Sequence, residues 1–146
     1  MHIRPLPFVL VIFLAVILFA ASQSPEVMER YKKFLNQHVN GKMAENQCDN
    51  VIRRRKISQR GTNDCKPVNT FILANKGQIN PVCAKAGRPY GKNLTISNLR
   101  FPIVTCKSKS QKKLPHCKYR GKKDTRWIVI GCVKGWPVHY EEGILL

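Results

Sequence analysis

The heptapeptide CKPVNTF, residues 65–71, determines most of what this sequence predicts. A cysteine begins the segment and an aromatic residue ends it, and Lys66, Asn69 and Thr70 lie between them. The lysine supplies a cation for an anionic group, while the amide and the hydroxyl can hydrogen-bond a base or a sugar. Residues 68–74 favour a β-strand. The segment therefore predicts a strand that carries part of a binding site.

The beginning of the chain is typical of a secretory signal peptide. Residues 6–21 are nearly all apolar, Arg4 precedes them, and small residues end the run. The run is too short for a spanning helix and has no stop-transfer flank, so a signal anchor is the less favoured alternative. We expect residues 1–22 to be the leader, with cleavage after Ser22, and residues 23–146 to form one secreted domain.

The charge of the chain is strongly positive. The 146 residues include 26 Lys and Arg but 8 Asp and Glu, a formal net charge of +18. Removal of the leader takes away Arg4 and leaves +17 (18 − 1). Such a chain is attracted to polyanions, namely nucleic acid, heparan sulfate or anionic lipid, and charge alone does not choose among them.

Six cysteines lie at positions 48, 65, 83, 106, 117 and 132. An even number in a short secreted chain indicates three disulfides formed in an oxidising compartment. Their spacing does not favour zinc, because there is no C-x-x-C and no histidine pairs with a cysteine at ligand intervals. Six cysteines allow 15 connectivities, and the spacing does not select one.

The pattern of apolar residues predicts helices first and strands later. Val27, Tyr31, Phe34 and His38 share one face of a helix over residues 26–39. A second helix is expected at about 44–55, and a short one at 76–82. An exposed hairpin loop is expected at the lysine-rich residues 107–113. Strands are expected at residues 68–74, 94–96, 101–107, 116–120, 126–133 and 138–140. This order indicates an α+β domain.

Two further motifs join the heptapeptide in suggesting a family. Gln37-His38 lies in RYKKFLNQHV, residues 30–39, and Pro137-Val138-His139-Tyr140 lies near the C-terminus. Together the three motifs resemble the pancreatic-type ribonuclease (ribonuclease A) superfamily, over residues 26–142. The resemblance implies N-terminal helices packed on a curved antiparallel sheet, with three disulfides: Cys48–Cys106, Cys65–Cys117 and Cys83–Cys132. Residues 84–93 lack the fourth bridge of most digestive members, which is similar to the angiogenin branch and to some non-mammalian members.

The resemblance also implies a catalytic mechanism. The 2′-hydroxyl of RNA attacks the adjacent phosphorus and expels the 5′-oxygen, which requires one group to accept a proton and another to donate one. Imidazoles suit both roles, because their pKa lies near the working pH. We assign His38 as the general base and His139 as the general acid. Lys66 is expected to stabilise the charge on the phosphate oxygens. Neither a cofactor nor a metal is expected.

Further site residues follow from the same resemblance. Gln37 is expected to hydrogen-bond the phosphate, and the backbone of Tyr140 to contact it. Thr70 is expected to bind the pyrimidine 5′ to the cleaved bond, and Asn69 to brace the site. These assignments predict cleavage of RNA 3′ to pyrimidines, through a 2′,3′-cyclic phosphate that is then hydrolysed.

Two acidic residues depart from the family pattern. Glu141 stands where the family usually has the aspartate that orients the second histidine. Glu142 stands where angiogenins carry a glutamine that obstructs the pyrimidine pocket. We therefore expect a weak, angiogenin-like ribonuclease.

Basic clusters suggest additional partners. Arg53, Arg54, Arg55 and Lys56 resemble the angiogenin arginine cluster, which implies a nuclear or nucleolar address, although such a run is also typical of a solvated helix face. A second basic region can bind RNA phosphates, heparan sulfate or anionic bacterial membranes. Its residues are Lys107, Lys109, Lys112, Lys113, Lys118, Arg120, Lys122 and Lys123.

Three functions are compatible with these patterns. The leading hypothesis is a secreted, monomeric endoribonuclease. The alternative is a secreted cationic effector, angiogenic or antimicrobial, that acts through its basic surface or a cell-surface receptor independently of catalysis. A nucleic-acid-binding module is less favoured, and it predicts equal affinity for DNA and RNA, since only RNA has the attacking 2′-hydroxyl.

Overall fold

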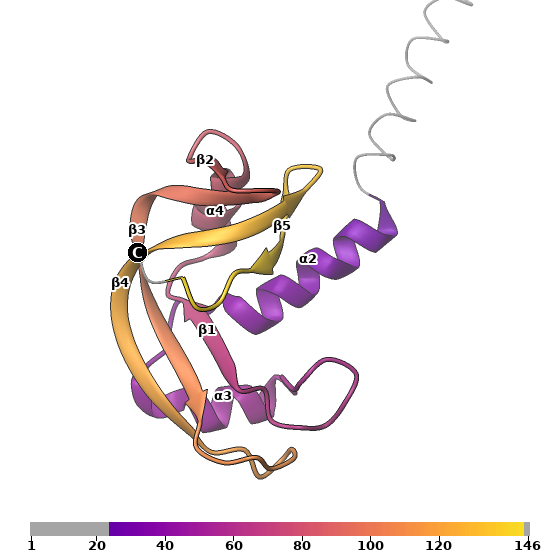
Figure 1. Cartoon of the computed structure of the whole chain (residues 1–146), viewed down its shortest axis with the longest axis vertical. Helices are drawn as coiled ribbons and strands as arrows, with labels where there is room; N and C mark the ends of the chain where they lie inside the picture. Colours follow the sequence, from indigo (N-terminus) through magenta and orange to yellow (C-terminus); the bar gives the residue numbers. More distant parts are fainter. Residues whose placement is uncertain (1–23, 145–146) are drawn as a thin grey trace, which may run out of the picture.

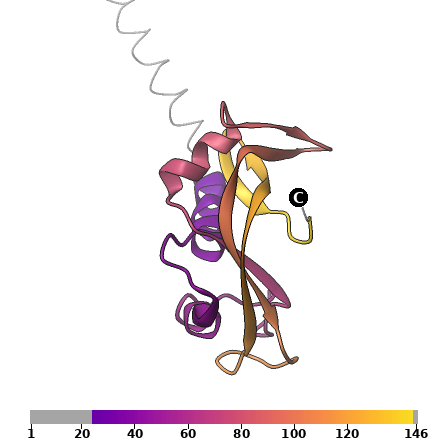
Figure 2. The ribbon, with the colours of Figure 1, turned by 90° about the vertical axis from the view of Figure 1, so that its left-hand side faces the viewer.

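One antiparallel sheet, with helices packed against it, forms the body of the molecule (Figures 1 and 2). The computed structural model describes residues 24–144, so the predicted signal peptide lies outside the described residues. Neighbouring strands follow the order β1-β3-β4-β5, and β2 pairs with β3. The strands are β1 (Val68–Ile72), β2 (Gly87–Tyr90), β3 (Leu94–Ser108), β4 (Tyr119–Val133) and β5 (Trp136–Tyr140). The helices are α2 (Pro25–His38), η1 (Glu45–Gln47), α3 (Cys48–Arg54), α4 (Lys76–Ile79) and η2 (Asn80–Cys83).

The fold confirms the predicted α+β class with three disulfides. Within the part of the chain that the structure describes, no helix is long and apolar enough to cross a membrane.

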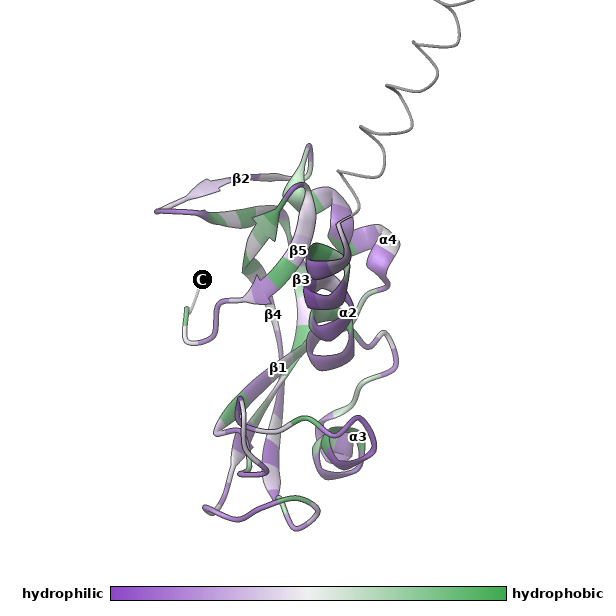
Figure 3. Cartoon of the chain, turned by 90° about the vertical axis from the view of Figure 1, so that its right-hand side faces the viewer, coloured by the Kyte–Doolittle hydropathy of each residue, from purple (hydrophilic) through white to green (hydrophobic). Residues whose placement is uncertain are grey.

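Helix α2 forms because its sequence supplies both a start signal and an apolar face. The side chain of Ser24 accepts a hydrogen bond from the backbone N–H of Val27, and Pro25 occupies the first turn. The predicted face, which ends in His38, is buried. The outer side of α2 is mainly hydrophilic (Figure 3). This packing places His38, the last residue of the helix, against the sheet.

The strand boundaries correct the sequence prediction. The strands expected at 94–96 and 101–107 are one strand, β3, and those expected at 116–120 and 126–133 are one strand, β4, which begins at Tyr119 rather than at residue 116. β3 continues through its bulge because Ser97 donates a hydrogen bond to the carbonyl of Leu99 (2.6 Å) and accepts one from the N–H of Ile128 (3.0 Å). β4 continues through residues 121–125, whose sequence is GKKDT, because their backbone pairs with residues 102–106.

Other elements differ from the prediction in smaller ways. Strand β2 was not expected, and β1 ends at Ile72 rather than at residue 74. The short helix expected at 76–82 divides into α4, with a capping box between Asn75 and Gln78, and η2. The helix expected at 44–55 divides into η1 and α3. The segment predicted as a hairpin loop, 107–113, begins within β3, and the carbonyl of Lys112 accepts a hydrogen bond from the N–H of Cys65 (2.8 Å).

Three disulfides and two apolar clusters hold the elements together. The bridges are Cys48–Cys106, Cys65–Cys117 and Cys83–Cys132, the pairs that the resemblance implies. Phe71 belongs to a cluster under α3, and its neighbour Ile72 belongs to a cluster under α2 and α4. Both side chains are fully buried, so β1 contributes to the core on both faces.

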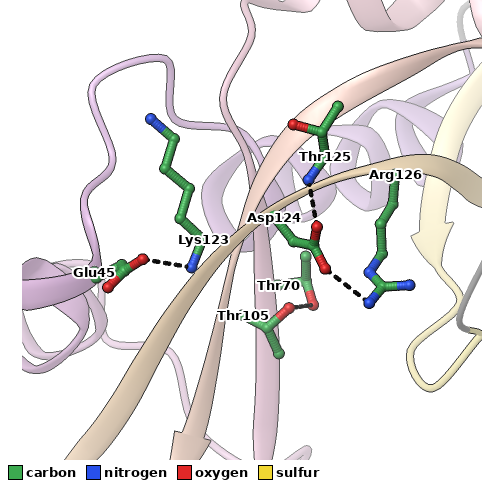
Figure 4. Close-up of polar contacts among 7 residues, drawn as sticks. All are labelled: Glu45, Thr70, Thr105, Lys123, Asp124, Thr125 and Arg126. Atoms are coloured by element: carbon green, nitrogen blue, oxygen red, sulfur yellow. Dashed lines mark hydrogen bonds and ion pairs between the residues drawn. The ribbon is translucent and has the colours of Figure 1, made fainter.

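The long hairpin of β3 and β4 lies very close to η1 and α3. A methyl group on Gly121 would overlap the carbonyl oxygen of Glu45 and lie 2.9 Å from Sγ of Cys48. The carboxylate of Glu45 also accepts a hydrogen bond from the backbone N–H of Lys123 (2.9 Å; Figure 4). Glycine at position 121 therefore permits the contact between the hairpin and the segment that leads into α3.

We predict that Gly121→Ala destabilises the protein, because the added methyl group overlaps the backbone of Glu45 and crowds the sulfur of the Cys48–Cys106 disulfide. The free energy of unfolding, measured by denaturant titration, should fall by about 1–3 kcal/mol. Gly41→Ala is the matched control, because its methyl group would meet no atom closer than 3.8 Å. Equal stability of the two variants would contradict the close packing described for position 121.

Candidate active site

The predicted catalytic residues line one cavity of about 650 Å³. Helix α2, the loop that follows α3, Lys66 and the C-terminal strand β5 with the residues after it surround this cavity. Of the predicted site residues, the lining includes Gln37, His38, Lys66, His139, Tyr140 and Glu141. Asn69 and Thr70 are buried, and they hydrogen-bond the lining residues Lys66 and Glu142. The structure thus gathers residues that lie up to 104 positions apart in the chain (141 − 37).

His38 is held in one orientation. Its side chain is 5 % exposed, and its Nδ1 lies 2.8 Å from the carbonyl oxygen of Thr70. Because a carbonyl oxygen only accepts hydrogen bonds, Nδ1 carries the proton and Nε2 of the neutral ring is left as an acceptor. The Tyr140 ring stacks on the imidazole, with ring centroids 5.2 Å apart. Burial, and then the charge of Lys66, lower the pKa of His38 to about 3, which favours the neutral form.

His139 has a different environment. Its side chain is 54 % exposed, and its Nε2 lies 2.8 Å from the Oε2 atom of Glu141. This contact with the carboxylate of Glu141 fixes the orientation of the imidazole. The site therefore contains one buried histidine held neutral and one exposed histidine paired with a carboxylate.

Lys66 is connected to helix α2 through Asn69. The Nζ atom of Lys66 donates a hydrogen bond to Oδ1 of Asn69 (2.8 Å), and Nδ2 of Asn69 donates one to the carbonyl of Gln37 (2.8 Å). Partial burial lowers the pKa of Lys66, and the charge of Glu142 opposes this shift. Asn69 is fully buried. Its amide therefore fixes the lysine relative to the residue that precedes His38.

Glu142 occupies the hydrogen-bonding groups of Thr70. One carboxylate oxygen accepts a hydrogen bond from the Thr70 backbone N–H (2.7 Å), and the other accepts one from its hydroxyl (2.6 Å). The hydroxyl also lies 3.2 Å from that of Thr105 on β3 (Figure 4). Burial raises the pKa of Glu142. The sequence showed the unusual residue, but not this contact, which joins positions 72 residues apart.

The basic cluster at residues 53–56 divides into two roles. Arg53 and Arg54 are exposed on α3, whereas the guanidinium of Arg55 donates hydrogen bonds to the carbonyls of Asn36 and Val39 (both 2.8 Å). These carbonyls belong to the end of α2, where backbone acceptors lack partners within the helix. Arg55 therefore caps the helix that carries His38. Sequence reasoning missed this role, because a cap contributed from another helix has no local signature.

Within residues 24–144, no group of three or more His, Cys, Asp and Glu side chains gathers in a way that could hold a metal ion. The predicted catalytic groups in the cavity are the imidazoles of His38 and His139 and the amine of Lys66.

Comparisons with known proteins agree with this arrangement. A family model described as pancreatic ribonuclease matches residues 29–141. Ribonuclease-like 3 of Danio rerio is 40 % identical over all of both chains, and Angiogenin-4 of Mus musculus is 40 % identical over 99 % of both chains. The X-ray structure of zebrafish RNase5 is 53 % identical and has a TM-score of 0.79, over 82 % of this chain and 98 % of that chain.

The chain belongs to the pancreatic ribonuclease family. Its fold is ribonuclease A-like, as the resemblance implied. Within this family it is an angiogenin-like member, as its three disulfides and its similarity to angiogenins show.

Burial of neutral His38 predicts a pH dependence of stability. Unfolded His38 takes up a proton below about pH 6.5, whereas folded His38 stays neutral down to about pH 3. The stability that this group contributes is therefore complete above pH 6.5 and is lost as the pH falls. Between these values, the free energy of unfolding of the wild type should fall more steeply than that of His38→Ala, by up to about 1.4 kcal/mol per pH unit. Equal pH slopes in urea titrations would refute the prediction.

Proposed function

We propose that this protein is a secreted, metal-independent endoribonuclease that cleaves RNA on the 3′ side of pyrimidines. One observation carries the proposal: a single cavity contains a buried imidazole held neutral, an amine and a second imidazole paired with a carboxylate. This is the set of groups that transfer of a phosphodiester to its neighbouring 2′-hydroxyl requires. Membership of the ribonuclease family supports the same activity.

In the first step, Nε2 of His38 takes the proton of the 2′-hydroxyl, and the 2′-oxygen forms a bond to phosphorus. The bond from phosphorus to the 5′-oxygen breaks, and protonated His139 gives its proton to that oxygen. With Nε2 held by Glu141, Nδ1 of His139 is the atom assigned to this transfer. The products are a 2′,3′-cyclic phosphate and a free 5′-hydroxyl.

In the second step, water opens the cyclic phosphate and the two histidines exchange roles. His139 takes a proton from water, and His38 returns one to the 2′-oxygen. In both steps Lys66 stabilises the negative charge on the phosphate oxygens, and Gln37 and the backbone of Tyr140 contact the phosphate. Both residues line the cavity beside His38, which supports these roles.

We propose further that the activity is weak because Glu142 competes with the substrate. A pyrimidine that binds through the N–H and hydroxyl of Thr70 must displace both oxygens of the Glu142 carboxylate. A displaced carboxylate also has to lie close to an incoming phosphate of the same charge. Both effects raise the free energy of the productive complex, compared with a protein whose Thr70 N–H and hydroxyl have no internal partner.

The alternative function, a cationic effector that is angiogenic or antimicrobial, rests on a different observation. The eight lysines and arginines of the second basic region are all exposed along β3, β4 and the loop between them. This surface is suited to heparan sulfate, an anionic membrane or a cell-surface receptor, and it does not need the catalytic cavity. Uptake into the nucleus or nucleolus through residues 53–56, and a monomeric state, are further proposals.

Substitution of the two histidines tests the mechanism. His38→Ala and His139→Ala should each reduce cleavage of tRNA and of pyrimidine-containing dinucleotides by at least about 10³-fold, because each removes a proton-transfer group. The refolded mature protein should release a 2′,3′-cyclic phosphate, detected by chromatography. Cleavage that survives His139→Ala would exclude the assigned mechanism. Killing of bacteria or endothelial responses that persist in this variant would support the alternative function.

Removal of the Glu142 side chain should increase activity. Glu142→Ala frees both hydrogen-bonding groups of Thr70, so kcat/KM for a cytidine-containing dinucleotide should rise by about tenfold, which corresponds to about 1.4 kcal/mol. Glu29→Ala, at an exposed position on α2, is the control for the loss of one negative charge. An unchanged or lower kcat/KM in Glu142→Ala alone would show that Glu142 does not compete with the pyrimidine.

A further inference from the structure

A triplet at the turn between β2 and β3 has no part in the site described above. Asn93-Leu94-Thr95 is the one place in the chain where an asparagine is followed two residues later by serine or threonine. In a protein that enters the secretory pathway, this pattern is the acceptor for N-linked oligosaccharides, provided that its middle residue is not proline. Because so short a pattern also occurs by chance, the geometry of the turn decides what it means.

The turn is open to solvent. Tyr90 of β2 pairs with Leu94 of β3, and residues 91–93 connect the two strands. All three connecting residues are exposed, and a methyl group added to Gly91 would meet no atom within 4 Å. The tip of this hairpin extends away from the helices (Figures 2 and 3). The side chain of Asn93 therefore has room for a bulky group.

The two polar groups that define the triplet are free. Among residues 24–144, no hydrogen bond engages the side-chain amide of Asn93 or the hydroxyl of Thr95. The φ of Asn93 is 61°, a conformation that asparagine tolerates, so the turn itself explains an asparagine here. The turn does not explain the hydroxyl. Thr95 lies in β3 opposite Pro89 and Ile130, where a β-branched side chain without a hydroxyl would pair equally well.

The contacts that fix the triplet form late in synthesis. Cys83, which precedes the hairpin, is joined to Cys132, 49 positions later. Thr95 pairs with Ile130, 35 positions later (130 − 95). Because the N-terminal part of a chain is made first, an enzyme that acts on the growing chain meets the triplet before β3 and β4 can pair. The triplet is therefore accessible both before and after folding.

We infer that Asn93 carries an N-linked oligosaccharide in the secreted protein. The amide nitrogen of Asn93 forms a bond to the anomeric carbon of a sugar carried on a lipid pyrophosphate. The bond from that carbon to the phosphate oxygen breaks, the lipid pyrophosphate leaves with the electron pair, and the amide proton passes to a base of the transferring enzyme. None of residues 87–97 lines the catalytic cavity, so the oligosaccharide is attached outside it. This inference rests on the secretion that we propose above.

Expression of the full chain in vertebrate cells tests the modification. The wild type and Thr95→Ser should be secreted in a form whose mass falls on treatment with peptide N-glycosidase, which converts the modified asparagine to aspartate. Asn93→Gln and Thr95→Val should lose this mass shift completely. Thr95→Val is the matched variant, because valine keeps the β-branched shape and removes only the hydroxyl. Thermal melting checks that the variants are folded. A secreted wild type with an unmodified Asn93 would overturn the inference.

A second measurement separates this inference from the proposed secretion. The full chain, reduced and unfolded, is incubated with detergent-permeabilised endoplasmic reticulum membranes, which supply the transferring enzyme and the lipid-linked oligosaccharide. Transfer to Asn93 in the wild type but not in Thr95→Val, detected by mass spectrometry, would support the site. Absence of transfer to the wild type would refute it. If transfer occurs here but cells retain the chain without cleaving its leader, the proposed secretion fails and the acceptor site remains.

Discussion

The outer edge of β1 is the constraint on which the site depends. β3 pairs with one edge of this strand, and no strand among residues 24–144 pairs with its other edge. Backbone groups that are buried need partners, and an uncovered edge invites pairing with another chain. Here the carbonyl of Ile72 accepts from the N–H of Asn40, the carbonyl of Thr70 accepts from His38, and the Thr70 N–H donates to Glu142. Covering this edge therefore brings the end of α2 and the C-terminal segment to the same place.

That arrangement links stability to activity. We assign pyrimidine binding to the N–H and the hydroxyl of Thr70. Both groups already donate hydrogen bonds to the carboxylate of Glu142. Under the proposed function, a substrate has to replace this internal contact rather than enter an open position. The protein without substrate therefore satisfies these hydrogen-bonding groups at the expense of substrate binding. Functional sites commonly show this opposition between stability and turnover. In this chain we assign that opposition to the side chain of Glu142.

Parts of the fold and the site follow from local patterns, and other parts do not. The face of α2, the heptapeptide and the two distant histidines were visible because each is written in a short segment. The continuity of β4 was not visible, because the segment GKKDT at 121–125 has no strand pattern of its own. Its backbone pairing depends on residues 102–106 of the opposite strand. The same limit applies to Arg55 and Glu142. Both act on residues at least 16 positions away, and only the tertiary structure brings these groups together.

The Cys65–Cys117 bridge has a consequence for the lifetime of the protein. Cys65 directly precedes Lys66, the proposed phosphate cation, and joins it to the loop between β3 and β4. Thiols in the cytosol and nucleus are kept reduced, whereas the extracellular space preserves such bridges. If a molecule enters a cell and this disulfide is reduced there, the covalent link next to the proposed catalytic amine is lost. Its activity there would be limited in time by the redox state of the compartment.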